Sequence, residues 1–369
     1  METTESGIPQ KFGFLVHARE VEDIFRKFPA LKIIPRGLLK IGMKYAPPII
    51  ASKITGLTTK ESKPLDGYIF AITMTAKQMV EDREFALKKI NQAINYAQKK
   101  GVGIIGLGAL TASFSKGGLA INSKGKPIGI TTGRAYTTKT VTDYVKQCIV
   151  EFGFNKSKVQ IAIVGAGGSI GSSCAKILAY YGIKNFLFID LPKRAEHLKQ
   201  TIENIKMDQA EINIFISHSI HDIKNADIII TATNAPEVLV VSEDLTPGTI
   251  IINDAQPSDV SIDVLKNRQD VLVIEGGVIH TPGIKGHLNM GLADEEDTFC
   301  CLGEVLILAH NQHFEDFALG ELDIKLINRI ENMSEELSIN LAKFQNSLGY
   351  ISEEQIAYVK NIISHKSND

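Results

Sequence analysis

The sequence predicts an α/β protein in which a doubly wound parallel sheet lies between an N-terminal α/β domain and a helical C-terminal region. Three observations predict it: short apolar runs alternate with helical stretches, a glycine-rich loop follows one of these runs, and helical periodicity dominates the end of the chain. With 369 residues the chain is long enough for two or three domains. We place them at residues 1–150, 151–285 and 286–369.

Residues 1–150 are expected to fold as the first α/β unit. A long helix is predicted over Lys77–Lys100, because apolar residues recur there at helical spacing. A second helix, from about Ala135 to Phe152, is expected to cross to the next domain. The strands predicted in this part are Phe12–Val16, Tyr68–Ile72, Val102–Leu107 and Pro127–Thr131.

The middle of the chain carries runs of Ile and Val that have the length of strands. Near-continuous apolar strands separated by helices are typical of a parallel sheet that is covered on both faces. The predicted strands are Val159–Val164, Phe186–Asp190, Ile212–Ile216, Ile228–Ala232, Ile250–Asn253 and Val271–Ile274.

A glycine-rich loop connects the first of these strands to a predicted helix at Ile170–Tyr181. In such a loop Gly165 allows a tight turn, and Gly167 lets the backbone approach a pyrophosphate at the positive end of the helix. The context of strand, loop and helix predicts a Rossmann dinucleotide site. Its predicted contacts from the loop are Gly165, Gly167, Gly168, Ser169, Ile170 and Gly171.

Two further segments are predicted to contact the cofactor. Asp190 ends the second strand of this unit, where a carboxylate would bind the ribose hydroxyls of NADH and repel the 2′-phosphate of NADPH. Lys193 and Arg194 follow closely and favour NADPH instead, unless they are ordinary surface charges. Thr231, Ala232, Thr233 and Asn234 end a later strand, so they either line the cofactor cleft or form a turn.

Composition excludes several classes of protein. A net charge of −2 gives no reason to expect a nucleic-acid partner. The chain shows no signal-peptide pattern, no run of roughly 18 apolar residues and no CxxC or HExxH motif, so we expect a cytoplasmic protein without a metal site. Its four cysteines form no disulfide framework and are expected to be reduced: Cys148, Cys174, Cys300 and Cys301.

Two of the cysteines follow an acidic run, Asp294–Asp297, which is predicted to open a helix because acidic residues suit the positive helix end. That helix end would lower the pKa of a cysteine in the next turn, whereas the neighbouring carboxylates would raise it. The pattern alone equally fits two inert, buried cysteines.

Beyond these motifs, most of the chain from about Phe12 to His310 resembles the cyanobacterial-type long-chain acyl-(acyl-carrier-protein) reductases. The order and spacing of the landmarks carry the resemblance. They are Phe12-Gly13 with His17, Ala46-Pro47-Pro48, Ala97–Gly101 with Leu107-Gly108, Thr131-Thr132-Gly133, Val164–Gly171, Gly276-Gly277-Val278 and Phe299-x-Cys301-x-x-Glu304.

The resemblance implies reduction of an acyl thioester to a fatty aldehyde by NADPH, with Cys301 as the nucleophile. Helical spacing places Val305 on the same face one turn later, where we expect it beside the acyl chain. The resemblance also implies an acyl carrier protein as acyl donor and an aldehyde-consuming enzyme as a further partner. His17, His280 and His287 are candidate proton carriers by residue type. Two other functions fit the layout: a shikimate-dehydrogenase-like enzyme acting on a small polar substrate, and a non-catalytic nucleotide-binding regulator.

A basic segment, Ile24–Lys60, bears on the partner. It contains eight basic residues and no acidic ones, interleaved with Ile, Leu, Met and Pro. Such a segment could dock an acidic carrier protein, lie against a membrane surface, or form a plain solvated face.

Overall fold

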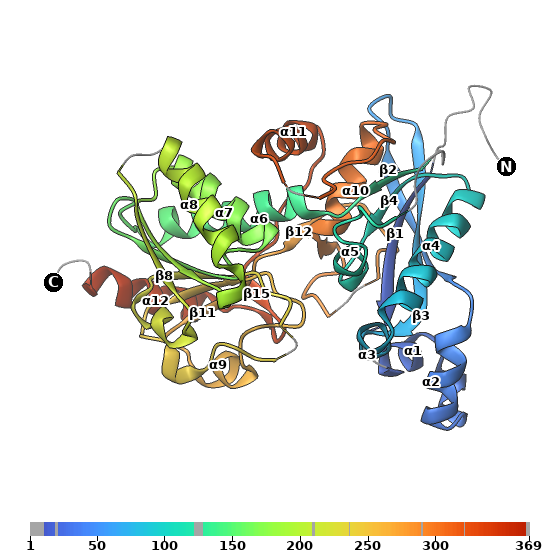
Figure 1. Cartoon of the computed structure of the whole chain (residues 1–369), viewed down its shortest axis with the longest axis horizontal. Helices are drawn as coiled ribbons and strands as arrows, with labels where there is room; N and C mark the ends of the chain where they lie inside the picture. The colour runs from blue at the N-terminus through green and yellow to red at the C-terminus, as the bar shows by residue number, and fades with distance from the viewer. Residues whose placement is uncertain are drawn as a thin grey trace.

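The computed structural model describes residues 11–18, 21–121, 128–208, 211–235, 237–288, 291–320 and 322–366. It contains two large sheets, each with helices packed against it, which lie at opposite ends of the molecule (Figure 1). The predicted α/β class is confirmed, and the predicted parallel sheet occupies the middle of the chain.

The first sheet has the strand order β2-β3-β1-β4-β5. Four of its strands are parallel, and β2 is added antiparallel at the edge. The sequence predicted four of the strands, although Pro127 lies outside the described residues, and it missed β2. The strands are β1 (Lys11–Ala18), β2 (Ile49–Thr58), β3 (Pro64–Thr75), β4 (Val102–Leu107) and β5 (Gly129–Thr131).

Helices cover both faces of this sheet. One face packs against α3 (Ala76–Glu81), α4 (Arg83–Lys99) and α5 (Leu110–Phe114), and the other packs against α10 (Cys300–His310). The single helix predicted over Lys77–Lys100 is therefore two helices. They separate at Asp82, because its carboxylate accepts a hydrogen bond from the Phe85 amide (3.2 Å) and so starts a new helix.

The second sheet consists of six parallel strands in the order β11-β10-β9-β6-β7-β8, which is the doubly wound order of a Rossmann unit. All six were predicted to within two residues at either end. The strands are β6 (Gln160–Val164), β7 (Asn185–Ile189), β8 (Asn213–Ser217), β9 (Ile228–Thr231), β10 (Ile250–Asn253) and β11 (Leu272–Glu275). The helices of this half are α7 (Ser169–Tyr180), α8 (Ala195–Asp208), α9 (Ile262–Asn267) and α12 (Glu353–Lys366).

The crossing helix α6 (Arg134–Glu151) runs between the two halves and packs against α7 on one side and α10 on the other. It is buried along most of its length and rich in threonine. Its Thr137, Thr138 and Thr140 hydroxyls donate to the backbone carbonyls four residues earlier (2.8–2.9 Å). A buried hydroxyl needs such a partner, so these bonds let a polar helix occupy the interior.

The sequence predicted that the region after residue 286 is helical, but this region also contains strands. The strands are β13 (Asp297–Phe299), β14 (Asn340–Leu341), β15 (Gln345–Asn346) and β16 (Gly349–Tyr350), and β12 (Val278–His280) pairs with β13 and β14. Its helices are divided between the two cores, since α10 and α11 (Ile324–Ser334) pack on the first sheet and α12 on the second. The domain limits stay a prediction.

The acidic run does not open a helix, and that prediction is wrong. Asp297 lies in β13, and α10 begins at Cys300 with no acidic residue in its first turn. The reason is tertiary: the buried Asp297 carboxylate accepts hydrogen bonds from His280 (2.8 Å) and Gln345 (2.6 Å). These partners hold the segment extended beside β12.

The remaining helices are α1 (Val21–Lys27), α2 (Arg36–Tyr45) and the short 3₁₀ turns at Pro29–Ile33, Pro192–Arg194, Ile220–Asn225 and Ser242–Asp244. Within the described ranges, no helix has the length and hydrophobicity needed to cross a bilayer.

Candidate cofactor and cysteine site

The glycine-rich loop forms the tight turn that the sequence predicted. Gly165 has φ +87°, and a Cβ at this position would lie 2.7 Å from the carbonyl oxygen of Ala232, so only glycine fits without strain. Helix α7 begins at Ser169, directly after the loop. The Ser169 hydroxyl oxygen is buried and has no hydrogen-bond partner among the described residues. An unpaired donor at a helix N-terminus fits a phosphate group.

Asp190 lies against the same loop. Its carboxylate accepts hydrogen bonds from the amides of Gly167 (2.8 Å) and Leu191 (2.7 Å). This bond ties the residue that follows β7 to the glycine-rich loop and occupies the Gly167 amide. The carboxylate also brings a negative charge to the place where the resemblance implies a cofactor phosphate.

The residues at the end of β9 and just after it contribute to the site. The Thr231 hydroxyl is buried and donates to Asn253 (2.9 Å), so this side chain joins β9 to β10. Ala232 presents its carbonyl oxygen to Gly165, and Asn234 is exposed. The Thr233 hydroxyl donates to Asp259 (2.7 Å). The backbone of 232–234 therefore lies beside the loop, whereas Ile170 packs into the core behind it.

Replacing Gly167 with Val should reduce dinucleotide affinity at least about a hundredfold, because a side chain would fill the space over the loop. Its Cβ would already lie 3.0 Å from the Asp190 carboxylate and 3.1 Å from Arg194. Isothermal calorimetry with NADPH and NADH measures the effect. The control is Gly37→Val, since a Cβ at Gly37 has nothing within 4 Å. Unchanged affinity of Gly167→Val would remove the loop from the site.

Cys300 and Cys301 are the first two residues of α10. Cys300 is only 3% exposed, and its sulfur lies 3.0 Å from the Thr137 hydroxyl. Cys301 is partly exposed. Of the two residues, Cys301, which the resemblance implies as the nucleophile, is therefore the more exposed, and the Cys300 sulfur is enclosed between α10 and α6.

A chain of backbone hydrogen bonds links this helix to the cofactor edge of the second sheet. The Asp254 amide donates to Thr231 (2.9 Å), the Gly276 amide donates to Asn253 (2.8 Å), and the Cys300 amide donates to Gly277 (2.8 Å). Since ligands of doubly wound sheets bind at the carboxyl ends of the strands, the start of α10 borders the predicted cleft.

Glu304, one turn after Cys301, is fully buried and holds the start of α6. Its carboxylate accepts hydrogen bonds from the amides of Gly133 (3.0 Å) and Tyr136 (2.8 Å) and from the Thr131 hydroxyl. A negative charge here also stabilises the positive end of the helix. The contact brings Gly133 so close to Cys301 that a Cβ on Gly133 would lie 2.4 Å from the Cys301 Cβ. Two sequence landmarks thus form one structural unit.

Asp254 is a member of this site that sequence reasoning missed. It follows β10, and its carboxylate lies 2.8 Å from the point that a Cβ at Gly277 would occupy, with the Cys300 sulfur 3.3 Å from the same point. Burial, together with Glu275 and Asp259, raises the pKa of Asp254 well above its usual range. Its place directly after a strand of the second sheet is the one signal that could have found it.

The environment of Cys301 decides between the opposing effects that the sequence left open. Burial of the thiol and then the charge of Asp254 raise the pKa of Cys301 to about 12, against hydrogen bonds from the helix amides that lower it. Residues of the acidic run are not among these causes. The free protein therefore holds a thiol here at neutral pH.

Alkylation of Cys301 by iodoacetamide should become about tenfold faster for each pH unit across the neutral and mildly alkaline range, because the thiolate fraction grows tenfold per unit below the pKa. Peptide mapping by mass spectrometry follows the reaction, with Cys301→Ala as the blank. A rate that levels off near neutral pH would show that the helix end outweighs burial.

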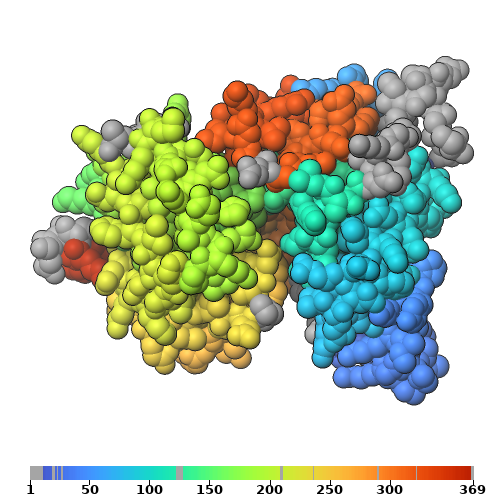
Figure 2. All heavy atoms as spheres, in the orientation of Figure 1, coloured from blue at the N-terminus to red at the C-terminus, as the bar shows by residue number. Residues whose placement is uncertain are grey.

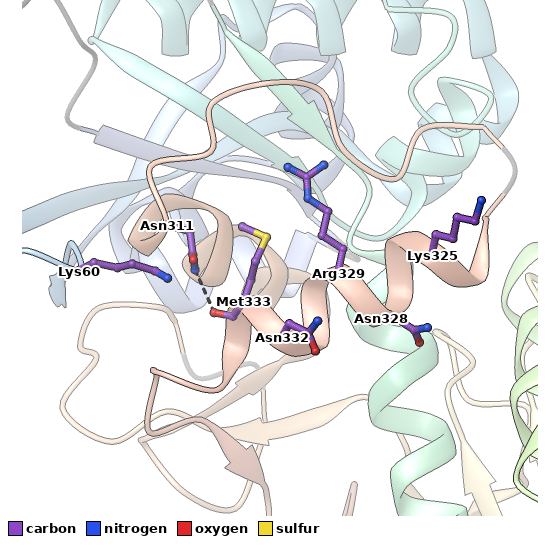
Figure 3. A pocket seen from close by; sticks show the side chains of 7 residues that line it. All are labelled: Lys60, Asn311, Lys325, Asn328, Arg329, Asn332 and Met333. Atoms are coloured by element: carbon purple, nitrogen blue, oxygen red, sulfur yellow. Dashed lines mark hydrogen bonds between the residues drawn. The ribbon is translucent and has the colours of Figure 1, made fainter.

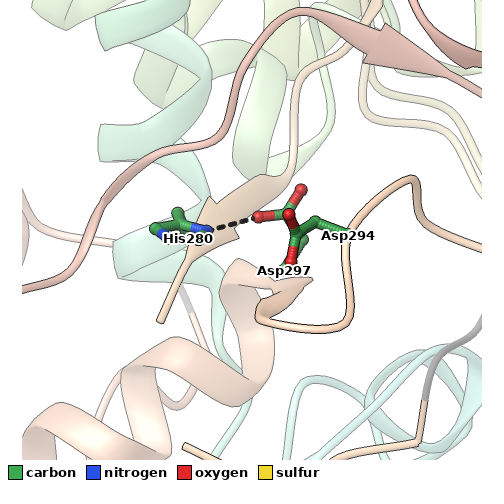
Figure 4. Close-up of side chains that lie close together, drawn as sticks. All are labelled: His280, Asp294 and Asp297. Carbon is green, nitrogen blue, oxygen red and sulfur yellow. Dashed lines mark hydrogen bonds and ion pairs between the residues drawn. The ribbon is translucent and has the colours of Figure 1, made fainter. Parts of the chain in front are cut away.

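The three candidate proton carriers lie on different elements. His17 lies in β1 and bonds the carbonyl oxygen of Ala18 (2.9 Å). His287 is buried in the loop after β12, and burial lowers its pKa. His280 forms a cluster with Asp294 and Asp297, in which the three ligand atoms lie within 4.8 Å of one another (Figure 4). Within this cluster His280 is hydrogen-bonded to Asp297, and the absence of a metal site stays a prediction.

A shallow surface pocket of about 510 Å³ lies elsewhere, between the end of α10 and helix α11 (Figure 3). Its polar lining includes Lys60, Lys325, Arg329 and Asn311. Asn311 directly follows α10, so the pocket is at the opposite end of the helix from Cys301, about 15 Å away along the axis. It is not part of the candidate site.

Comparison with known proteins supports the coarse assignment. The shikimate/quinate 5-dehydrogenase family model matches residues 148–274, which cover the second sheet as far as β11. A long-chain acyl-[acyl-carrier-protein] reductase of Synechococcus elongatus is 24% identical over 343 residues, which are 88% of this chain and 96% of the relative.

A second relative is much longer than this chain. The aminotransferase PigE of a Serratia species is 24% identical over 324 residues, which are 84% of this chain but only 37% of PigE. Among solved structures, L-tryptophan dehydrogenase of Nostoc punctiforme aligns with 98% of this chain and 90% of its own, with 11% identity and a TM-score of 0.39.

The strand order, the glycine-rich loop and the dehydrogenase family model together define the class of this protein. It has the Rossmann fold of an NAD(P)-dependent oxidoreductase, with a nicotinamide dinucleotide as its cofactor.

Proposed function

We propose that this protein reduces long-chain acyl thioesters to fatty aldehydes with NAD(P)H, through an acyl-enzyme on Cys301. The observation that carries the proposal is the position of Cys301: partly exposed, at the start of a helix that is hydrogen-bonded to the carboxyl edge of the dinucleotide sheet. A thiol beside a hydride-donor site is what thioester reduction requires. The acyl-[acyl-carrier-protein] reductase relative, which aligns over nearly its whole length, supports the same reaction.

In the first step the Cys301 sulfur attacks the thioester carbonyl carbon. The bond from that carbon to the carrier sulfur breaks, and the carrier leaves as a thiol with the proton of Cys301. The acyl group is then held on Cys301. The backbone amides at the start of α10 stabilise the oxyanion that forms during this exchange.

In the second step the acyl-enzyme is reduced. When bound, the cofactor supplies a hydride; Gly165, Gly167, Ser169 and Asp190 are the residues that would hold it. The carbon–sulfur bond then breaks, which releases the aldehyde and returns the thiol to Cys301. One proton is needed, and we assign it to the Asp254 carboxyl, whose pKa is raised by burial.

We propose NADPH as the preferred cofactor, on the resemblance, with Asp190 as the residue that opposes it. Asp190→Ser should raise the ratio of kcat/KM for NADPH to that for NADH by about tenfold, because it removes a charge that repels the 2′-phosphate. Steady-state kinetics with both cofactors measure this ratio. A preference of the unmodified protein for NADH would show that the carboxylate governs the choice.

A shikimate-dehydrogenase-like activity on a small polar substrate is the second candidate, favoured by the family model that matches residues 148–274. Such a reaction needs no cysteine. Cys301→Ser separates the two candidates, because the dehydrogenase would keep nearly normal turnover and the thioester reductase would lose its aldehyde product. A regulator without activity would bind the cofactor, but no acyl thioester would cause it to oxidise the cofactor.

The direct test is intact-protein mass spectrometry after incubation with a long-chain acyl thioester and no cofactor. Without hydride the acyl-enzyme cannot be reduced, so the protein should gain the mass of one acyl group. Acyl carrier protein and CoA thioesters are compared as donors, and we propose the carrier protein as the natural one. We also propose that an aldehyde-consuming enzyme is a partner of this protein and that the protein is cytoplasmic.

A further inference from the structure

The segment that precedes β2 forms a small lobe at one end of the first sheet. It consists of α1, the 3₁₀ turn Pro29–Ile33 and α2 (Figure 1). In the space-filling view the lobe projects from the body of the molecule as the dark blue corner (Figure 2). Its interior is a separate small core made by Val21, Phe25, Leu39 and Met43.

Helix α2 is held firmly to the body by its inner side and its ends. The buried ammonium of Lys89 donates to the carbonyl oxygens of Tyr45 (3.0 Å) and Ala46 (2.7 Å), which end the helix. The Gln78 amide donates to the carbonyl oxygen of Lys40 (2.8 Å). These contacts hold the helix against the body of the protein. The exposure of its outer face is therefore not a result of loose packing.

The outer face of α2 is apolar. Leu38, Ile41 and Tyr45 lie three and four residues apart, so they share one side of the helix, and they are 63%, 60% and 64% exposed. Ile33, just before the helix, is 88% exposed. Large aliphatic side chains grouped on a projecting surface usually mark an interaction site.

The basic residues of α2 form a second stripe beside the apolar one. Arg36, Lys40 and Lys44 are spaced four residues apart, and no acidic residue occurs between Ile24 and Lys60. Arg36 pairs with Glu22 (2.7 Å) and Lys44 with Asp82 (2.8 Å). Lys40, and Lys32 in the preceding turn, form no ion pair with any described residue.

We propose that this lobe docks the protein on an anionic lipid surface, with Ile33, Leu38 and Ile41 inserted among the lipids and the cations against the headgroups. An outward apolar stripe flanked by cations is the pattern of helices that lie in the membrane interface. The positive charge of the basic residues favours an anionic binding partner. The projecting, convex shape of the lobe suits a bilayer better than the surface of a second folded protein. The proposal is independent of the proposed reaction.

Sedimentation of the full chain with vesicles tests it. The protein should bind phosphatidylcholine vesicles that contain phosphatidylglycerol. It should bind vesicles of phosphatidylcholine alone much more weakly. The variant Ile33→Ser/Leu38→Ser/Ile41→Ser should bind at least about tenfold more weakly, because it removes the inserted side chains. The variant Lys32→Glu/Lys40→Glu should lose the preference for anionic vesicles, as should raised salt.

The matched control is Val150→Ser/Tyr180→Ser/Met207→Ser, which removes three exposed apolar side chains from the other half of the molecule and should bind like the unmodified protein. Circular dichroism verifies that each variant is folded. Three results would overturn the proposal: no binding to anionic vesicles, equal loss in the control variant, or a lobe that binds another protein instead. The last result would appear as self-association, or as binding of an acidic carrier protein in the absence of vesicles. In either case only the lobe variants would abolish the association.

Discussion

Cys301→Ala should abolish both the acyl-enzyme and aldehyde formation, with a loss in kcat of about a thousandfold or more, as expected when a nucleophile is removed. Cys300→Ala should keep both. The measurement combines aldehyde production with tryptic peptide mapping of the adduct, which should be found on the peptide carrying Cys301 and be assigned to that residue by fragmentation.

The geometry explains why two adjacent cysteines should differ so much. Successive residues of a helix point about 100° apart, so one sulfur can face the cleft while the other faces the interior. Cys300 is enclosed beside Thr137, whereas Cys301 keeps part of its surface exposed. An adduct on Cys300, or full aldehyde production by Cys301→Ala, would contradict the mechanism and leave the dinucleotide fold unaffected.

Glu304→Leu should lower the free energy of unfolding by about 3–5 kcal/mol, because it leaves the Gly133 and Tyr136 amides and the Thr131 hydroxyl buried without an acceptor. Acylation of Cys301 should also slow in the fraction that stays folded, since Glu304 fixes Gly133 against Cys301. Chemical denaturation measures the first effect and intact mass after a short acylation pulse measures the second.

Two variants make this result interpretable. Glu304→Gln keeps one acceptor oxygen and should have a smaller effect on stability. Glu203→Leu places the same substitution on the exposed face of α8 and should change stability by no more than about 0.5 kcal/mol. If Glu304→Leu is no less stable than Glu203→Leu, the carboxylate does not hold the start of α6.

The sequence by itself determined most of the second sheet. A parallel strand that is buried on both faces must be apolar at nearly every position, so its burial is visible in the composition of the run. For this reason Ile250–Asn253 was predicted with its observed bounds. The glycine-rich loop is equally local, because its turn and its close approach to Ala232 depend on the backbone freedom of Gly165.

Elements with mixed composition were not predictable in this way. Strand β2 lies at the edge of its sheet and mixes Ile with Lys and Thr, so its pattern was hidden within a basic segment. The acidic run matched the local preference of a helix start but is a strand, because His280 and Gln345 hold Asp297 extended. Val305, expected beside the acyl chain, is instead fully buried in the first core.

The features of the site also differ in whether the sequence could predict them. The sequence alone singled out the glycine-rich loop, because the loop carries its chemistry in its own residues, whereas Cys301 was distinguished from Cys300 only by the family resemblance. Only the tertiary structure revealed that Asp254 lies near both cysteines, and that Glu304 holds Gly133 across 171 residues of chain. Local preference leaves its mark in neighbouring residues, whereas the partner of a buried carboxylate is chosen by packing between distant segments, which no single stretch of sequence records.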